Sequence, residues 1–247
     1  MSGHSKWANI KHKKAKTDAA KGVSFAKFSR EIIISAKMGG ADPAANFRLR
    51  TAIDKAKAGG LPNDTIKRAI EKGAGAGSSD NFEEITYEGY GAGGVAVFVE
   101  AATDNRNRTA GDIRSYFTKF GGNLGETGCV GWIFEPAGVV YFDKSCNYDK
   151  LFEDGIEFDI KDIEDDEDRW KVITSVENFQ LTVEGYEKLG YKILESDLVR
   201  IPSNSVEIKD VDTAKKVMLL LEKLEEHDDV QNVYSNFETD DEIMEKL

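Results

Sequence analysis

The chain has 247 residues, of which 40% are apolar and 32% are charged, so it is a globular protein and neither a fibrous nor a disordered one. It contains 33 Lys and Arg against 45 Asp and Glu, a net charge of −12. The charge is divided unevenly: residues 1–73 carry 16 basic and 6 acidic side chains, a net of +10, whereas residues 74–247 carry 17 and 39, a net of −22. A basic N-terminal part joined to an acidic remainder predicts an anionic partner for the first part.

Several protein classes are excluded by simple patterns. No apolar run approaches the roughly 20 residues that a membrane-spanning helix needs, and residues 1–20 contain no apolar core of a signal peptide. The two cysteines, Cys129 and Cys146, are too few for a disulfide scaffold and have no metal-binding or redox spacing. We therefore expect a cytoplasmic protein without a membrane partner.

Residues 1–21 are predicted to form a basic arm. They contain six lysines, with Trp7, His4 and His12 among them, and Asp18 is the only acidic residue. Few of these residues could enter a core. Such a segment is typical of a tail that becomes ordered on a polyanion.

Residues 22–73 are predicted to form a basic bundle of three helices. The first covers 23–38, where apolar residues recur at helical spacing. The second is expected from Asp42, as N-cap before Pro43, to residue 58, and the third from 63 to 73. Residues 74–79 are rich in Gly and Ser and lie where the charge changes sign, which predicts a linker.

The rest of the chain is predicted to be α+β. The pattern indicates strands at 95–100 and 130–134 around a helix at 107–120, and strand–helix–strand again over 205–237. Between them, 139–199 follows the order β-α-β-β-α-β of a ferredoxin-like fold, with a strand near 158–163 and an acidic turn at 164–168. This predicts a middle domain of residues 80–135 and 202–247, with a ferredoxin-like domain of residues 136–201 inserted into it.

The sequence contains no catalytic constellation that we can identify. Gly89–Gly94 matches the spacing of a dinucleotide-binding loop, but it precedes a strand and opens no helix, so a glycine-rich turn is the better interpretation. Three histidines and two distant cysteines give no metal-ligand spacing. The acidic runs at 153–168 and 225–242 are typical of a solvated surface. We expect no enzyme, no cofactor, no metal and no small-molecule substrate.

The basic arm is the strongest signal for a binding function, because lysines with an interleaved aromatic residue suit phosphate contacts and base stacking. A second signal is residues 104–109, which lie between a strand and a helix. The arginines of this segment could bind an anion at the helix N-terminus. Alternatively, Asp104 or Asn105 is a simple N-cap and the arginines pair with surface acids, and the sequence favours neither interpretation. The predicted nucleic-acid-binding residues are Lys6, Trp7, Lys11, His12, Lys13, Lys14, Lys16, Arg30, Arg48, Arg50, Arg106 and Arg108.

Several segments together resemble one known family. The chain is similar to the YebC/PmpR family at 3–12 (GHSKWANIKH), 87–91 (YEGYG), 103–109 (TDNRNRT) and 121–125 (GGNLG). Residues 28–32, 49–53 and 228–231 resemble it as well. The resemblance extends over essentially the whole chain and is weakest at about 143–195.

The resemblance implies three domains, one helical, one α+β and one ferredoxin-like and inserted, in a cytoplasmic protein that is not an enzyme. Members of the family are usually assigned as DNA-binding transcriptional regulators. A competing view makes them ribosome-associated translation factors that contact ribosomal or transfer RNA, with a mitochondrial translational activator as a relative and a role at proline-rich nascent chains. The residues leave both alternatives open, and the acidic body could face a basic protein.

Overall fold

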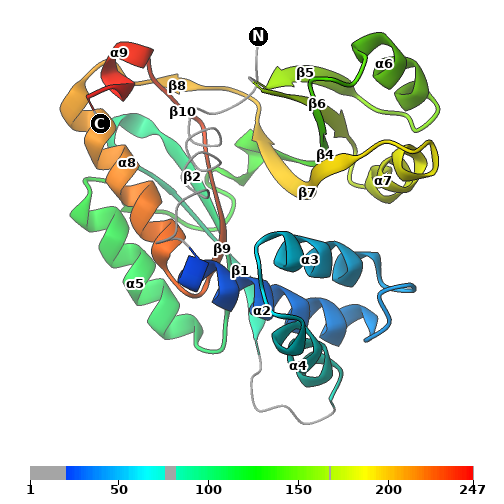
Figure 1. The fold of residues 1–247 in the computed structure, drawn as a ribbon. Helices are drawn as coiled ribbons and strands as arrows, with labels where there is room; N and C mark the ends of the chain where they lie inside the picture. Colours follow the sequence, from blue (N-terminus) through cyan, green and yellow to red (C-terminus); the bar gives the residue numbers. More distant parts are fainter. Residues whose placement is uncertain (1–20, 76–81, 167, 247) are drawn as a thin grey trace. The chain divides into compact units, whose positions relative to one another are not determined.

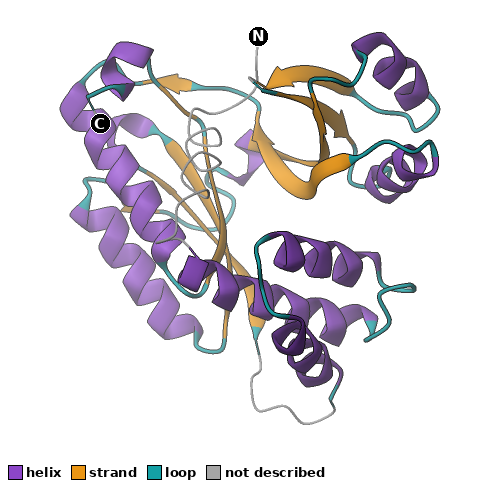
Figure 2. Ribbon diagram, in the orientation of Figure 1, coloured by secondary structure: helices purple, strands orange, loops and turns teal. Residues whose placement is uncertain are grey.

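The computed structural model describes residues 21–75, 82–166 and 168–246 (Figures 1 and 2). It combines α-helices with largely antiparallel sheets and divides into two compact units. The smaller unit runs from Glu135 to Ile201. The larger unit joins residues 21–75 and 82–134 with the described chain from Pro202 onwards, so among the described residues the smaller unit is formed by one stretch of sequence and the larger one is not. The two units are described separately below.

The larger unit begins with three helices, α2 (Lys21–Gly39), α3 (Phe47–Ala58) and α4 (Asn63–Ala74). They enclose a small core built from Ile32, Ile33, Ala36, Leu49, Ala52, Ile53, Ala56, Leu61, Ile66 and Ala69. The backbones of α2 and α4 approach closely at Gly73, where an added Cβ would lie 2.3 Å from the carbonyl oxygen of Ile33. A glycine is therefore required at this helix crossing.

The second helix does not begin at Asp42, as the sequence had suggested, but at Phe47. Asp42 instead closes a short turn, in which its Oδ1 accepts from the backbone N of Ala44. The N-cap is Asn46, whose Oδ1 accepts from Leu49 N while its Nδ2 donates to the carbonyl oxygens of Ser35 and Gly40, both at 2.8 Å. Asn46 is a stronger N-cap than Asp42 would be, because its buried side-chain amide hydrogen-bonds to two carbonyl oxygens as well as to the start of the helix.

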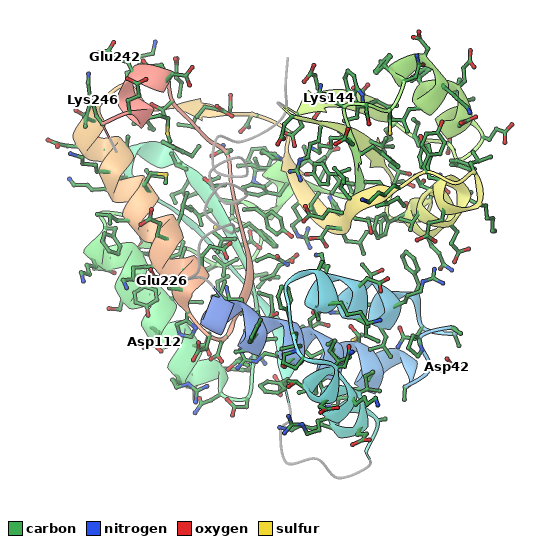
Figure 3. All side chains as sticks on the ribbon, viewed as in Figure 1. Asp42, Asp112, Lys144, Glu226, Glu242 and Lys246 are labelled. Atoms are coloured by element: carbon green, nitrogen blue, oxygen red, sulfur yellow. The ribbon has the colours of Figure 1, made fainter. Side chains whose placement is uncertain are left out.

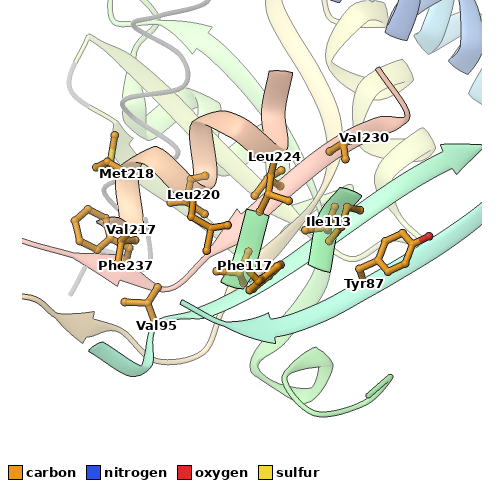
Figure 4. Close-up of a cluster of buried hydrophobic side chains, with 14 of the residues drawn as sticks. Tyr87, Val95, Ile113, Phe117, Val217, Met218, Leu220, Leu224, Val230 and Phe237 are labelled. Atoms are coloured by element: carbon orange, nitrogen blue, oxygen red, sulfur yellow. The ribbon is translucent and has the colours of Figure 1, made fainter. Parts of the chain in front are cut away.

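The larger unit also contains a four-stranded sheet in the order β3-β1-β2-β9. Its strands are β1 (Glu83–Tyr90), β2 (Ala96–Thr103), β3 (Asn123–Leu124) and β9 (Val230–Ser235), and each pairs antiparallel with its neighbour. Helices α5 (Arg106–Lys119) and α8 (Val211–Glu226) supply the buried side chains that pack on one face (Figure 4). This is the main core of the unit, and it holds α5 against the sheet through the buried Ile113 and Phe117.

The other face of this sheet is covered by the chain between β3 and β4. Ala96 and Phe98 of β2 pack there against Val130, Ile133 and Phe134. Two short strands, β8 (Val206–Glu207) and β10 (Phe237–Glu238), pair in parallel, and a short helix α9 (Asp241–Met244) follows.

Residues 130–134, predicted as a strand, instead contain a 3₁₀ turn, η3 (Gly131–Ile133). The buried carboxylate of Glu88 explains the difference, because it accepts from the backbone N of Gly128, Val130 and Gly131 at 2.6–2.9 Å. These donors are therefore unavailable to a neighbouring strand. The partner of β2 on the side away from β9 is β1, a strand that the sequence analysis did not predict.

The smaller unit contains β4 (Phe134–Asp143), α6 (Tyr148–Ile156), β5 (Asp162–Asp166), β6 (Arg169–Thr174), α7 (Phe179–Lys188) and β7 (Ile193–Pro202). The sheet order β5-β6-β4-β7 is that of a ferredoxin-like fold. The acidic segment predicted as a turn lies partly in β5, which begins at Asp162. Its carboxylates are tolerated there because Glu164 and Asp166 lie beside Lys171 and Arg169 of β6.

Candidate nucleic-acid interface

The structure tests the placement of only some predicted binding residues. The arm residues Lys6, Trp7, Lys11, His12, Lys13, Lys14 and Lys16 lie outside the described residues. The arginines at 30, 48, 50, 106 and 108 are all described. They belong to three groups, on α2, on α3 and at the start of α5.

Arg30 of α2 is engaged within the protein. Its NH1 lies 3.1 Å from Oδ1 of Asp229, and it also donates to the carbonyl oxygen of Asp228. The guanidinium group stands over the ring of Phe82, 4.7 Å from its centroid. Only 14% of the side chain is exposed, so Arg30 offers little surface to an external phosphate.

Arg48 and Arg50 of α3 are also half-buried and have internal contacts. Arg48 Nε is 2.8 Å from Glu31, and its NH2 is 2.6 Å from Glu84 of β1. Burial by itself would lower the pKa of Arg48, but hydrogen bonds to Glu84 and Glu31 and their charges outweigh it and raise the pKa. The guanidinium of Arg50 lies over the ring of Phe47, 5.1 Å from its centroid.

The start of α5 has the geometry of a capped helix with paired arginines. Asn105 Oδ1 accepts from Arg108 N, which identifies Asn105 as the N-cap. Arg108 NH2 lies 2.8 Å from Asp104 and 3.2 Å from Asp229, and Arg106 lies 3.7 Å from Glu83. Both arginines remain more than half exposed, so contact with a polyanion at this helix start stays a prediction.

Asp229 is the centre of this network, although only 3% of the residue is exposed. Its Oδ2 accepts from the hydroxyls of Thr109 at 2.6 Å and Thr103 at 3.1 Å, while Arg30 and Arg108 approach from outside. Burial by itself would raise the pKa of Asp229, but hydrogen bonds from Thr109 and Arg108 and the charge of Arg30 lower it. Segments 103–109 and 228–231, far apart in sequence, therefore meet at one carboxylate.

The turn that carries Asp229 is itself attached to α5. His227 Nδ1 accepts from Asp229 N at 3.1 Å, and its Nε2 lies 3.3 Å from Asp112 of α5. Figure 3 shows Asp112 on α5 near the end of α8, where Glu226 is labelled. The sequence analysis missed the role of Asp229, and the resemblance of 228–231 to the family was the signal that could have found it.

The outer face of α5 carries further basic side chains that the sequence analysis did not single out. The helix contains three arginines and one lysine against one aspartate, a net of +3 in the acidic part of the chain. A shallow depression of about 550 Å³ on this face is lined by Gly111, Arg114, Ser115, Thr118 and Lys119. Within the described ranges the guanidinium of Arg114 has no hydrogen-bonding or ionic partner. We call this surface, together with Arg106 and Arg108, the α5 face.

Residues 21–75, 82–166 and 168–246 contain no group of three or more His, Cys, Asp or Glu side chains placed to hold a metal ion. Both cysteines are free thiols, and burial raises the pKa of Cys129 and of Cys146, which disfavours the thiolate form. Among the same residues no helix is long and apolar enough to cross a membrane.

Comparisons with known proteins agree along the chain. A profile described as the TACO1/YebC protein N-terminal domain matches residues 5–76, and one described as the TACO1/YebC second and third domain matches residues 82–237. Relatives from Desulfitobacterium hafniense and Dictyoglomus thermophilum are 49% and 50% identical over 249 residues, which cover 100% of this chain and 99% and 100% of theirs. Both relatives are named probable transcriptional regulatory proteins.

A solved structure supports the fold. The crystal structure of a conserved hypothetical protein from Aquifex aeolicus superposes with a TM-score of 0.84 at 46% sequence identity. The match covers 93% of this chain and 95% of that one. The mixed α and β architecture is therefore shared along nearly the whole chain.

Proposed function

Because the chain belongs to the TACO1/YebC family, we propose that it is a regulatory protein that binds nucleic acid and acts in transcription, as the names of its relatives suggest. In this proposal it is a binding protein and not an enzyme. The basic arm and the exposed lysines of the helical bundle contact phosphate groups, and the α5 face adds a second contact surface.

The observation that carries this proposal is the separation of charge. Residues 1–73 have a net charge of +10 although the whole chain has −12. In the bundle, Lys57, Lys67, Arg68 and Lys72 are exposed on α3 and α4. A basic surface maintained on an acidic protein is the electrostatic signature of a polyanion partner.

The acidic remainder supports a second candidate, a ribosome-associated factor in translation. Residues 74–247 have a net charge of −22, which a bare duplex would repel. A ribonucleoprotein offers RNA phosphates and basic proteins together, so it could accommodate both parts of the chain. This candidate also uses the arm and the α5 face, with RNA in place of DNA.

One experiment tests the proposal and separates the two candidates. The full chain is sedimented with purified bacterial ribosomes at physiological salt, with excess mixed-sequence duplex DNA as competitor. In parallel, its affinity for the duplex is measured as a function of salt. Binding to the duplex in the supernatant supports transcription, and pelleting that survives the competitor supports translation.

A matched pair of variants makes the test specific for the arm. Replacing Lys11, Lys13, Lys14 and Lys16 by Ala should reduce the slope of log affinity against log salt concentration for the duplex, by the contribution of up to about four phosphate contacts. Replacing the exposed Lys150, Lys161, Lys188 and Lys192 of the smaller unit by Ala removes the same charge and should leave it unchanged. Equal effects of both variants, or no binding to either target, would overturn the proposal.

A further inference from the structure

Helix α6 of the smaller unit has apolar residues on its outward side. Tyr148, Phe152 and Ile156 follow each other at intervals of four and therefore share one side of the helix. Their exposed fractions are 39%, 40% and 61%. The inward side is already occupied by the buried Leu151 and Gly155, so the fold of the unit does not require the outer residues to be apolar. We call the three exposed residues the α6 stripe.

The rings of the α6 stripe are held in place before any partner arrives. The rings of Tyr148 and Phe152 are stacked, with centroids 6.3 Å apart and an interplanar angle of 15°. The ring centroid of Tyr148 also lies 5.2 Å from that of Trp170 of β6. Trp170 Nε1 donates to the carbonyl oxygen of Cys146, and Nζ of Lys144 lies over the Trp170 ring, 3.5 Å from its centroid. Lys144 is labelled in Figure 3. A preorganised aromatic surface loses little side-chain freedom on binding.

A row of carboxylates runs beside the apolar row. Asp149, Glu153 and Glu157 each follow one stripe residue, and all three are exposed. Like charges at intervals of four repel each other, and a carboxylate at the C-terminal end of a helix, as at Glu157, opposes the helix dipole. In the described part of the chain none of the three has an ionic partner. The helix dipole favours Asp149 in the first turn, but the repulsion within the row and the position of Glu157 are unfavourable, and a cationic partner would relieve both.

We propose that the α6 stripe and its carboxylate row form a docking surface for a Lys- and Arg-rich segment of a partner protein. Apolar side chains of that segment pack on the rings of Tyr148 and Phe152, and its cations meet the carboxylates. The charge of the unit selects the partner, because residues 135–201 contain 18 acidic and 8 basic side chains, a net of −10. A nucleic acid is repelled by the same field. This surface is independent of the proposed nucleic-acid contacts.

The test uses the full chain and a synthetic amphipathic peptide of Leu and Lys, with a Leu and Glu peptide of the same pattern as its control. Binding is measured by fluorescence anisotropy of the labelled peptide at low and at physiological salt. The Lys peptide should bind saturably and the Glu peptide should not. The double variant Phe152→Ser/Ile156→Ser should weaken binding at least about fivefold, because it removes the apolar anchors.

Charge reversal tests the carboxylate row separately. Glu153→Lys/Glu157→Lys should weaken binding of the Lys peptide about tenfold or more at low salt. The matched controls are the double variants Leu181→Ser/Leu189→Ser and Glu177→Lys/Glu187→Lys at and beside α7. They change two exposed apolar and two exposed acidic residues elsewhere in the same unit and should leave affinity nearly unchanged. Circular dichroism and thermal melting confirm that each variant is folded.

Three outcomes would overturn the proposal. The first is equal weakening by the α6 and the α7 variants, which would indicate only general attraction to an acidic protein. The second is the absence of saturable binding. The third is tighter peptide binding after deletion of residues 1–21, which would assign the α6 stripe to the basic arm of the same chain. Because the charge-neutral variant Phe152→Ser/Ile156→Ser should leave duplex affinity unchanged, failure here is distinguishable from failure of the proposed nucleic-acid function.

Discussion

Arg30 of α2 and Asp229, which precedes β9, form an ion pair with NH1 and Oδ1 3.1 Å apart, in which the exposed fractions of the side chains are only 14% and 4%. The pair joins the three-helix part of the larger unit to its sheet. The same carboxylate accepts hydrogen bonds from Thr103 and Thr109 and so holds the start of α5. One buried residue therefore positions both basic surfaces of the candidate interface.

Replacement of Asp229 by Asn should destabilise the larger unit. The amide cannot neutralise Arg30, and it places an NH₂ group where two hydroxyls and a guanidinium donate. Breaking a buried, hydrogen-bonded pair costs about 3 kcal/mol in the free energy of unfolding. Urea denaturation followed by circular dichroism measures this loss. The matched control is Asp228→Asn, because the Asp228 side chain is exposed and only its backbone carbonyl contacts Arg30. Equal stability of the two variants would contradict a central role for Asp229.

The same carboxylate predicts a pH dependence of stability. The pKa of Asp229 is lowered in the folded protein, so as pH falls the unfolded chain takes up the proton first. The stabilisation is complete above the ordinary aspartate pKa of about 3.9 and is lost as pH falls through the lower, folded-state value. Urea denaturation of the parent chain and of Asp229→Asn over this range should show their difference in unfolding free energy shrinking towards low pH. A constant difference would show that the ionised carboxylate is not the stabilising group.

The sequence predicted most elements of the fold where local signals were strong. Helices at 23–38, 107–120 and 213–227 were found because apolar residues recur at helical spacing, and the structure places α2, α5 and α8 there. It failed where a distant side chain decides the backbone. Residues 130–134 looked like a strand, but Glu88 binds the amides that a strand would use.

The candidate site was predicted less well than the fold, because the periodicity of apolar residues does not indicate which charged side chains form ion pairs. The sequence presented Arg30 and Arg48 as available cations and left the pairing of Arg108 with surface acids open, whereas each of the three has a carboxylate partner supplied by a distant segment. Asp229 looked like one more surface acid in the run at 225–242. Conversely, Arg114 was overlooked because it lies inside a helix with no motif around it.

The backbone N–H groups of Gly128, Val130 and Gly131 donate to the Glu88 carboxylate, an arrangement we call the Glu88 clamp. Removing it should loosen the segment that covers the second face of the sheet. In Glu88→Gln one oxygen must serve three backbone N–H groups, and the new NH₂ group faces donors. We expect a loss of about 1–3 kcal/mol in unfolding free energy and faster amide hydrogen exchange at Gly128, Val130 and Gly131. Glu126→Gln on the same segment is the control, since Glu126 is exposed. Unchanged exchange at these three amides would contradict the clamp.

Gly89 explains why β1 was missed, and it makes a separate prediction. Glycines usually mark turns, yet Gly89 lies inside β1. The position has no room for a side chain, because an added Cβ would be 2.6 Å from the carbonyl oxygen of Asn123 and 2.7 Å from the ring of Phe117. Gly89→Ala must therefore displace β3 or α5, and we expect destabilisation by about 1–3 kcal/mol, the usual cost of overpacking. Thermal and urea unfolding measure it. Gly111→Ala, on the open side of α5, is the control and should be neutral or stabilising.

The α5 face should contribute to nucleic-acid binding without contributing to stability. Arg114→Ala/Lys119→Ala removes two exposed cations, so it should reduce the salt dependence of duplex or ribosomal RNA binding by about two phosphate contacts and change unfolding free energy by less than about 0.5 kcal/mol. Arg108→Ala should behave differently, because it leaves Asp104 and Asp229 without that partner and so lowers stability as well. Lys188→Ala/Lys192→Ala on the smaller unit removes an equal charge and serves as the control. If the Arg114 and Lys119 variant binds like this control, the α5 face is only a solvated helix surface, and the basic N-terminal part carries the binding alone.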